Sequence, residues 1–333
     1  MGQTAAIILA AGQGSRMRSK QAKVLHPLAG LEMVNHAVRS VRLAAFDRII
    51  VVVGYQAEKV QGVLEQVTLA EQKEQLGTGH AVNQCREILR DFDGPVLVTY
   101  GDTPLFRSET FRELVQFHQQ GQAGATILTA IFADPTGYGR IVRDREGNVL
   151  GVVEHKDANE RERQITEINT GTYCFDSKLL FEYLAQITPD NVQAEYYLPD
   201  VLPLMLQGGH TIRGYVLEDA TESMGINDRI QLSQAEAILR DRICTHWQKQ
   251  GVTIVDPKST WIEWDCQIGQ DSVIYPGCFI QKGTVIGEDC RIGPHCRLTG
   301  AQIGDGVRME HAIIEGRVVA SGEKIAPFSL LTK

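Results

Sequence analysis

The 333-residue sequence has no apolar run of the roughly 18 residues that a membrane-spanning helix requires. It also lacks a basic segment before the N-terminal apolar run 5–11, so this run does not have the form of a signal peptide. Acidic residues outnumber lysine and arginine, and the net charge of −8 is opposite to that of a general nucleic-acid-binding protein. We therefore expect neither a membrane nor a nucleic acid as a partner.

The sequence also lacks the cysteine pattern of a disulfide framework. Its seven cysteines are an odd number, and no secretion signal precedes them. Free cysteines are typical of the reducing cytoplasm, which is the location we predict. No Cys-x-x-Cys pair is present, so a zinc site is not predicted either.

The composition, 43% apolar and 22% charged, predicts a globular chain of two or three domains. Residues 4 to about 226 alternate between strand-like and helix-like segments, which predicts an α/β fold with a mixed, mostly parallel sheet. The predicted strands are 5–9, 48–53, 95–100, 125–132, 149–154, 169–175 and 211–217. The predicted helices are 33–45, 79–90, 108–120, 177–184, 198–207 and a linker helix at 227–247.

Beyond Gly251 the hydrophobic period changes to six residues. An aliphatic residue recurs at Ile262, Ile268, Ile274, Ile280, Ile286, Ile292 and Leu298, and the residue two before each of the last six is Cys, Ser or Thr. This repeat predicts a parallel β-helix with one aliphatic and one small side chain pointing inward in each hexapeptide. We expect four of the cysteines to fill these small inward positions as packed free thiols. A cap is expected around residues 317–333.

The most informative segment is LAAGQGSRM, residues 9–17, which follows a short apolar run. Its two closely spaced glycines, followed by Arg16, predict a loop that offers backbone N–H groups and a cation to a phosphate. The spacing excludes a Walker loop, and Met17 stands where a Rossmann fingerprint needs a small residue. By itself, the Gly-x-Gly pair fits an ordinary strand-to-helix turn equally well.

Further motifs give this loop its context. They are KVLH (23–26), EQLGTGH (74–80), YGD (100–102), GYGR (137–140), EHKD (154–157), EINTG (167–171) and GIN (225–227). Together with the loop, this series resembles the bacterial N-acetylglucosamine-1-phosphate uridyltransferases from residue 5 to about 230. The resemblance implies a Rossmann-like nucleotidyltransferase domain at 1–227, a linker helix at 228–250 and a short left-handed parallel β-helix at 251–333. One departure is Ala22, which replaces the proline that usually precedes the lysine.

The implied reaction is the transfer of a uridylyl group from UTP to N-acetylglucosamine 1-phosphate, which yields UDP-N-acetylglucosamine and pyrophosphate. Because two anions must approach each other, catalysis depends on positioning and on neutralising charge at the α-phosphate. The resemblance implies that Arg16 and Lys23 are the catalytic cations. It implies nucleotide-binding roles for Leu9, Ala10, Ala11, Gly12, Gln72, Gly77 and Thr78, and sugar-binding roles for Tyr100, Gly101, Gly139, Glu154 and Asn169.

Asp102 follows an apolar strand, and its residue type leaves two roles open. A carboxylate facing phosphates suits Mg²⁺, which proteins hold through one or two oxygens together with phosphates and water. Asp102 could instead cap the following helix. The resemblance favours the metal, and it implies Mg²⁺ as cofactor with Asn227 as the second oxygen ligand.

Most members of the family are bifunctional, with a second site on a longer β-helix that acetylates glucosamine 1-phosphate from acetyl-CoA. This chain has about eleven hexapeptides before Lys333, so we expect it to lack acetyl transfer. We expect the β-helix to assemble the chain into a homotrimer, as the resemblance implies.

Two alternatives stay open at this point. The first is a nucleotidyltransferase for another sugar 1-phosphate or nucleotide, which would share the loop and the fold. The second is a non-catalytic assembly subunit of the same architecture. The presence of Arg16, Lys23, Asp102 and Asn227 together argues against the second alternative, because a scaffold has no need of cations and a metal ligand in one site.

Overall fold

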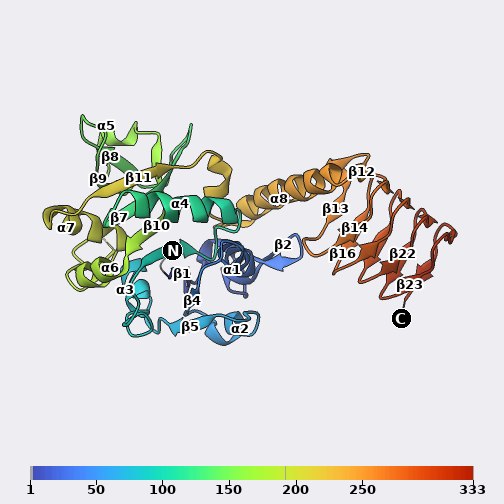
Figure 1. Cartoon of the computed structure of the whole chain (residues 1–333), viewed down its shortest axis with the longest axis horizontal. Helices are drawn as coiled ribbons and strands as arrows, with labels where there is room; N and C mark the ends of the chain where they lie inside the picture. The colour runs from blue at the N-terminus through green and yellow to red at the C-terminus, as the bar shows by residue number, and fades with distance from the viewer. Residues whose placement is uncertain (1–2, 192, 333) are drawn as a thin grey trace. The chain divides into compact units, whose positions relative to one another are not determined.

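The computed structural model describes residues 3–191 and 193–332 of the chain (Figure 1). They divide into two compact units. The first contains the residues up to His26 together with Met33–Asp228, and the second contains Pro27–Glu32 together with the residues from Arg229 onward. The short segment 27–32 therefore packs with the C-terminal unit, although it lies inside the range predicted for the nucleotidyltransferase domain.

The first unit is built on a nine-stranded mixed sheet. Its strands are β1 (Ala5–Ala10), β4 (Arg48–Val53), β5 (Thr68–Glu71), β6 (Pro95–Tyr100), β7 (Ala125–Ile131), β8 (Arg140–Arg143), β9 (Val149–Val153), β10 (Glu167–Asp176) and β11 (Ile212–Val216). The main strand order is β11-β7-β10-β6-β1-β4-β5, with β8 attached to β10 and β9 attached to β8. β1 is parallel to β4 and β6, whereas β10 is antiparallel to β6 and β7.

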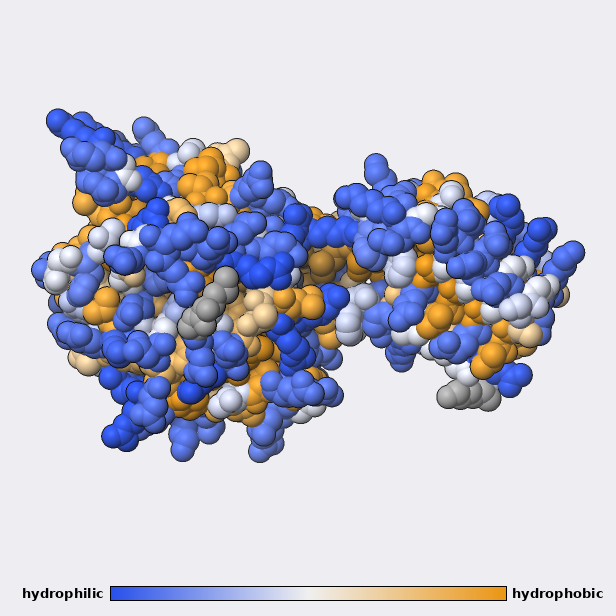
Figure 2. All heavy atoms as spheres, in the orientation of Figure 1, coloured by the Kyte–Doolittle hydropathy of each residue, from blue (hydrophilic) through white to orange (hydrophobic). Residues whose placement is uncertain are grey.

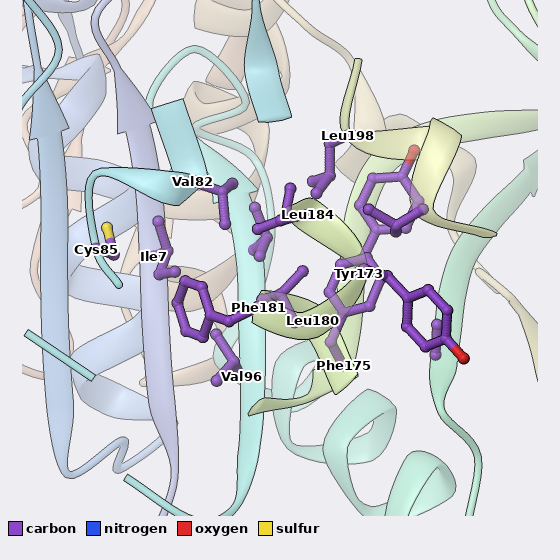
Figure 3. Packing of buried hydrophobic residues seen from close by; sticks show 14 of the residues in the cluster. Ile7, Val82, Cys85, Val96, Tyr173, Phe175, Leu180, Phe181, Leu184 and Leu198 are labelled. Atoms are coloured by element: carbon purple, nitrogen blue, oxygen red, sulfur yellow. The ribbon is translucent and has the colours of Figure 1, made fainter. Parts of the chain in front are cut away.

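Helices cover both faces of this sheet. They are α1 (Met33–Leu43), α2 (Ala57–Gln61), α3 (Thr78–Asn83), α4 (Ser108–Gln120), α5 (Glu160–Arg163), α6 (Ser177–Leu184) and α7 (Val201–Gln207), with short 3-10 helices at Ser15–Met17, Lys23–Leu25, Leu198–Asp200 and Ala220–Ser223. Alternate residues of β1 enter two different clusters, one shared with α3, α6 and α7 and the other with α1 and α4. Burial on both faces explains why β1 is apolar throughout. Figure 3 shows the first cluster, in which Ile7, Val96 and Phe175 pack with Phe181 and Leu184.

The second unit contains the long helix α8 (Arg229–Lys249), the short pair β2 (Pro27–Leu28) and β3 (Leu31–Glu32), a 3-10 helix at Pro257–Ser259 and thirteen short strands. These strands are β12 (Thr253–Ile254), β13 (Trp261–Ile262), β14 (Gln267–Ile268), β15 (Val273–Ile274), β16 (Phe279–Gln281), β17 (Val285–Ile286), β18 (Arg291–Ile292), β19 (Arg297–Thr299), β20 (Gln302–Ile303), β21 (Arg308–Met309), β22 (Ile313–Glu315), β23 (Val318–Val319) and β24 (Leu330–Leu331). They form three parallel sheets, ordered β12-β15-β18-β21, β13-β16-β19-β22-β24 and β14-β17-β20-β23.

The hexapeptide prediction is confirmed by these sheets. Partners such as Ile262 and Ile280 lie three hexapeptides apart, and the predicted aliphatic column from Ile262 to Leu298 is buried. The cysteines at 266, 278, 290 and 296 are free and buried, as predicted. β23 and β24 pair with earlier coils, so the parallel stacking continues into the region for which we predicted a cap.

The secondary structure differs from the predictions at several elements, and the short elements β2, β3, α2 and α5 were not predicted. The helix predicted at 79–90 ends at Asn83, and turns closed by bonds such as Leu89 N to Cys85 O (3.0 Å) replace its second half. β5 and β8 were not predicted, because each has only four residues and no clear alternation of apolar and polar side chains.

No helix in the described part of the chain is long and apolar enough to cross a bilayer. Polar side chains cover most of the visible surface (Figure 2).

Candidate active site

The glycine loop leaves the carboxyl end of β1 and turns back against Lys23. Gly14 has a φ of +66°, and a Cβ added there would lie 2.5 Å from the Cβ of Lys23. Only glycine allows this close approach in this backbone conformation. The following 3-10 turn carries Arg16, so one short segment brings both predicted cations to the end of β1.

The two cations and the two predicted metal ligands meet in one cluster. The ammonium of Lys23 pairs with the carboxylate of Asp102 and also donates to Asn227 Oδ1 over 3.1 Å. Arg16 Nη2 donates to the same Asn227 oxygen over 2.9 Å. The backbone N–H of Ile226 donates to the carbonyl of Asp102 over 2.9 Å, which holds the segment before α8 against the end of β6.

The donor set of this cluster fits a divalent cation. The oxygens of Asp102 and Asn227 converge on a single positive group, the Lys23 ammonium, and both are hard donors of the kind that Mg²⁺ prefers. The alternative role for Asp102 is wrong, because α4 begins after Arg107 and has no side-chain cap. Within residues 3–191 and 193–332, no three His, Cys, Asp or Glu side chains gather into a potential metal centre, so a cation here would rely on few protein ligands.

A cavity of about 270 Å³ opens beside the loop. Its lining includes every residue predicted to bind the nucleotide, namely Leu9, Ala10, Ala11, Gly12, Gln72, Gly77 and Thr78, together with Lys23 and Asp102. Gln72 is buried, and its Nε2 donates to the Gly77 carbonyl and contacts His80 Nδ1, each over 3.0 Å. Gly77 has a φ of +106°, and a Cβ there would lie 2.5 Å from the Tyr196 carbonyl, so a side chain would close this wall.

A second cavity, of about 310 Å³, adjoins the first and shares Thr78 and Tyr100 with it. Its lining includes three of the predicted sugar-binding residues, Tyr100, Glu154 and Asn169.

Four predicted site residues line neither cavity, and contacts hold each of them next to residues that do. Gly139 accepts a hydrogen bond from Asn169 N over 2.9 Å, and Gly101 donates to Leu9 O over 2.9 Å. Arg16 and Asn227 belong to the cation cluster.

Within the second cavity, Glu154 has an acidic and poorly solvated environment. Burial raises the pKa of Glu154, and the nearby carboxylates of Asp157 and Asp200 raise it further. Burial, with smaller contributions from Asp102 and Glu154, also raises the pKa of Tyr100. Tyr100 is therefore a protonated hydrogen-bond donor at the boundary between the two cavities.

Several lining residues were not predicted. They are Gly14, Val24, Gln75, Ala81 and Glu195 in the first cavity, and Gly137, His155, Lys156, Asp157, Tyr173, Asn191, Gln193, Tyr197 and Pro199 in the second. Residues 193–199 are held at the site by backbone bonds, from Tyr196 N to Leu76 O and from Gly79 N to Tyr196 O, each 2.8 Å long. The sequence offered two signals for this group. The motifs EQLGTGH, GYGR and EHKD contain Gln75, Gly137 and residues 155–157. Tyr173 lies four residues after Asn169 in the same predicted strand, and therefore on the same face.

Comparisons with known proteins agree with this architecture. A family model described as nucleotidyl transferase matches residues 5–253, and a model described as bacterial transferase hexapeptide (six repeats) matches residues 265–300. The chain is 49% identical over 325 residues to the bifunctional protein GlmU of Shouchella clausii (strain KSM-K16), a match that covers 97% of this chain and 72% of that protein. It is 49% identical to GlmU of Geobacillus sp. (strain WCH70), covering 97% and 71% of the two chains, and 47% identical to GlmU of Brevibacillus brevis, covering 99% and 72%.

These matches span both units and bear out the resemblance drawn from the motifs. The two family models are both described as transferases, which supports an enzyme over the non-catalytic alternative. The chain belongs to the GlmU family and is a nucleotidyltransferase.

Proposed function

We propose that this enzyme transfers the uridylyl group of UTP to N-acetylglucosamine 1-phosphate and releases pyrophosphate. The observation that carries the proposal is the pair of adjoining cavities that share Thr78 and Tyr100, with Lys23 and Asp102 on the wall of the first. A nucleotide in the first cavity and a sugar phosphate in the second would meet beside the cation cluster. A phosphate oxygen of the sugar phosphate would then attack the α-phosphorus as the bond to pyrophosphate breaks.

Arg16 and Lys23 lower the barrier in this proposal by neutralising negative charge. The attacking phosphate is already anionic near neutral pH, so the site does not need a general base. The two cations instead hold the triphosphate in line with the attacking oxygen and stabilise the charge that builds up in the transition state. Their present contacts with Asn227 and Asp102 support this role, because they keep both side chains at the end of β1.

The environment of Gln72 favours uracil. Its amide nitrogen is engaged by Gly77 and His80, which leaves the amide oxygen as the atom that can accept a hydrogen bond from a base in the cavity. Uracil carries an N–H at position 3 and satisfies this acceptor, whereas cytosine carries a second acceptor there. We therefore expect UTP to be a far better substrate than CTP.

Asp102 and Asn227 would hold the Mg²⁺ that we propose as cofactor. When bound, the metal supplies positive charge to the triphosphate oxygens. The residues of this chain contribute two oxygen ligands and orient them through the bond between Ile226 and Asp102.

Pyrophosphate release from UTP and N-acetylglucosamine 1-phosphate in the presence of Mg²⁺ tests the proposal directly. Chromatography of the nucleotide product should show UDP-N-acetylglucosamine. No turnover with this pair, combined with turnover of glucose 1-phosphate or another nucleoside triphosphate, would refute it in favour of a different sugar nucleotidyltransferase.

We also propose a homotrimer formed through the β-helix. Phe279, Ile313 and Leu330 are exposed apolar residues in a column of the β-helix that also contains the exposed Arg297 between Phe279 and Ile313, and we propose that this column contacts a second copy. Light scattering should then give three times the chain mass of 36.9 kDa.

The cytoplasmic location and the lack of acetyl transfer stay predictions. Incubation with acetyl-CoA and glucosamine 1-phosphate tests the second, and thiol release would contradict it.

A further inference from the structure

A bulge in β10 forms part of the wall of the second cavity, in which we propose that the sugar phosphate binds. The pairing of β10 with β7 shifts register between Asn169, opposite Thr129, and Tyr173, opposite Ile127. Gly171 lies inside the bulge with a φ of +81°, and a Cβ there would lie 2.7 Å from the ring of Tyr100. Bulges of this kind redirect side chains next to binding sites. Here Tyr100, Asn169 and Tyr173 all line the same cavity.

The hydrogen bonds around Asn169 determine what the phenol of Tyr173 can do. Asn169 Oδ1 accepts from Gly171 N over 3.0 Å, which identifies the other end of its side chain as the amide nitrogen. This nitrogen, Nδ2, donates to the Tyr173 hydroxyl oxygen over 2.7 Å. The Tyr173 hydroxyl is therefore an acceptor in its contact with Asn169, and its own hydrogen is left to donate elsewhere.

No acceptor for that hydrogen occurs among the residues that the structure describes. Tyr173 is fully buried as a residue, yet it lines the second cavity. Because the hydroxyl oxygen already accepts from Asn169, its hydrogen is the part of the group that is available to a molecule in the cavity. Burial also raises the pKa of Tyr173 well above its ordinary value, which keeps the proton on the oxygen.

We propose that Tyr173 donates its phenolic hydrogen to the acetamido carbonyl oxygen of the sugar, and so selects N-acetylated sugar phosphates. This role rests on the proposed function. The carbonyl oxygen of an amide can only accept, and therefore needs a donor. Sugar hydroxyl groups carry hydrogens of their own and are matched by the carboxylate of Glu154 in the same cavity. The rings of Tyr100 and Tyr197 suit the acetamido methyl group.

Tyr173→Phe is the matched test, because it removes the hydroxyl and keeps the ring that stacks on Phe175 at 5.4 Å between centroids. We expect kcat/KM for N-acetylglucosamine 1-phosphate to fall about tenfold, the effect of one buried hydrogen bond to a ligand. For glucose 1-phosphate, which has no acetamido group, we expect less than a roughly twofold change, below the size of one hydrogen bond. KM for UTP should be unchanged.

Calorimetric titration with UDP-N-acetylglucosamine and with UDP-glucose repeats the comparison without turnover. Tyr215→Phe is the control, since its hydroxyl donates to Glu113 Oε2 over 3.0 Å away from both cavities. This variant should keep the wild-type preference, and thermal unfolding should confirm that both variants fold.

Equal losses for the two sugars would overturn the proposal, because Tyr173 would then act only by orienting Asn169. An unchanged kcat/KM for the N-acetylated substrate would overturn it as well. A wild-type enzyme that is inactive with N-acetylglucosamine 1-phosphate would refute the proposed function itself. An active wild type whose sugar preference survives in Tyr173→Phe refutes only the role of Tyr173.

Discussion

Replacing Lys23 with methionine tests the cation cluster most directly. The change removes the ammonium that pairs with Asp102 and donates to Asn227, and it keeps much of the apolar stem. If Lys23 stabilises charge on the α-phosphate, kcat should fall by about a hundredfold or more, as for other preorganised donors to a developing charge. The assay is pyrophosphate release at saturating UTP and sugar phosphate.

The same substitution has a calculable effect on stability. The side chains of Lys23 and Asp102 are only 11% and 19% exposed, so the pair lies between a surface ion pair and a fully buried one. Surface pairs contribute at most about 1 kcal/mol, whereas removing one partner of a buried pair costs about 3–5 kcal/mol. We therefore expect a loss of about 2 kcal/mol, which for a unit of this size lowers Tm by about 6 °C.

Lys178→Met provides a matched control. Lys178 also pairs with an aspartate, Asp93, over 2.6 Å, but both side chains are about 70% exposed. We expect no measurable change in turnover or in Tm. The double variant Lys23→Met with Asp102→Asn should recover stability relative to Lys23→Met, because no unpaired carboxylate remains, but it should not recover activity. A Lys23→Met enzyme with more than about a third of wild-type turnover would refute the role of Lys23, since losing such a donor costs far more.

Three further predictions concern buried side chains. Burial and the carboxylates of Asp157 and Asp200 raise the pKa of Glu154, so its ionised form destabilises the fold at neutral pH. Glu154→Gln should therefore raise Tm at pH 7. A gain in Tm that persists below pH 4, where Glu154 is protonated, would contradict this cause. Burial lowers the pKa of His118 to about 4, so the unfolded chain binds a proton that the fold excludes, and about 3 kcal/mol of stability is lost between pH 6.5 and 4. His118→Gln should flatten the dependence of Tm on pH over that range, and an unaltered slope would exclude His118 as its source. Ile280→Ala should lower the free energy of unfolding of the β-helix by about 2–5 kcal/mol in chemical denaturation, because the side chain is fully buried. A loss below about 1 kcal/mol would mean that the coils repack around the cavity left by the substitution.

The sequence could predict those parts of the fold in which the position of a residue in the repeating backbone determines whether its side chain must be apolar, small or polar. In the β-helix, each inward position must be aliphatic or small, so the six-residue period from Ile262 to Leu298 is visible without a structure. The apolar strand 5–10 is equally visible, since both of its faces are buried. The residues next to this strand that were predicted to bind the nucleotide line one cavity, because a short loop can only lie at the carboxyl end of the strand.

Features held by backbone contacts were not predicted. Gln193, Tyr197 and Pro199 line the second cavity, but the bonds of Tyr196 to Leu76 and Gly79 join backbone atoms, which any residue provides. The end of α3 at Asn83 was missed for a related reason. Cys85, Leu89 and Phe92 keep an apolar spacing close to that of a helix and are buried, yet they lie in turns. A helix-like apolar spacing indicates which residues are buried, but not that the backbone between them is helical. Here the three side chains are buried by tertiary packing although the backbone forms turns.

The direction of β10 explains why the second cavity lies at the same edge of the sheet as the glycine loop. Ligands of open α/β sheets bind at the carboxyl ends of parallel strands, and β1 and β6 present the glycine loop and Asp102 at that edge. Because β10 is antiparallel, its first residues reach the same edge, and Asn169 lies opposite Thr129 near the end of β7. In the proposed function, the phosphate-binding residues follow the parallel strands β1 and β6, whereas β10 contributes Asn169 and Tyr173 to the second cavity beside Tyr100 and Glu154. Substitutions at the start of β10 should therefore alter the choice of sugar while leaving Lys23 and Asp102 in place.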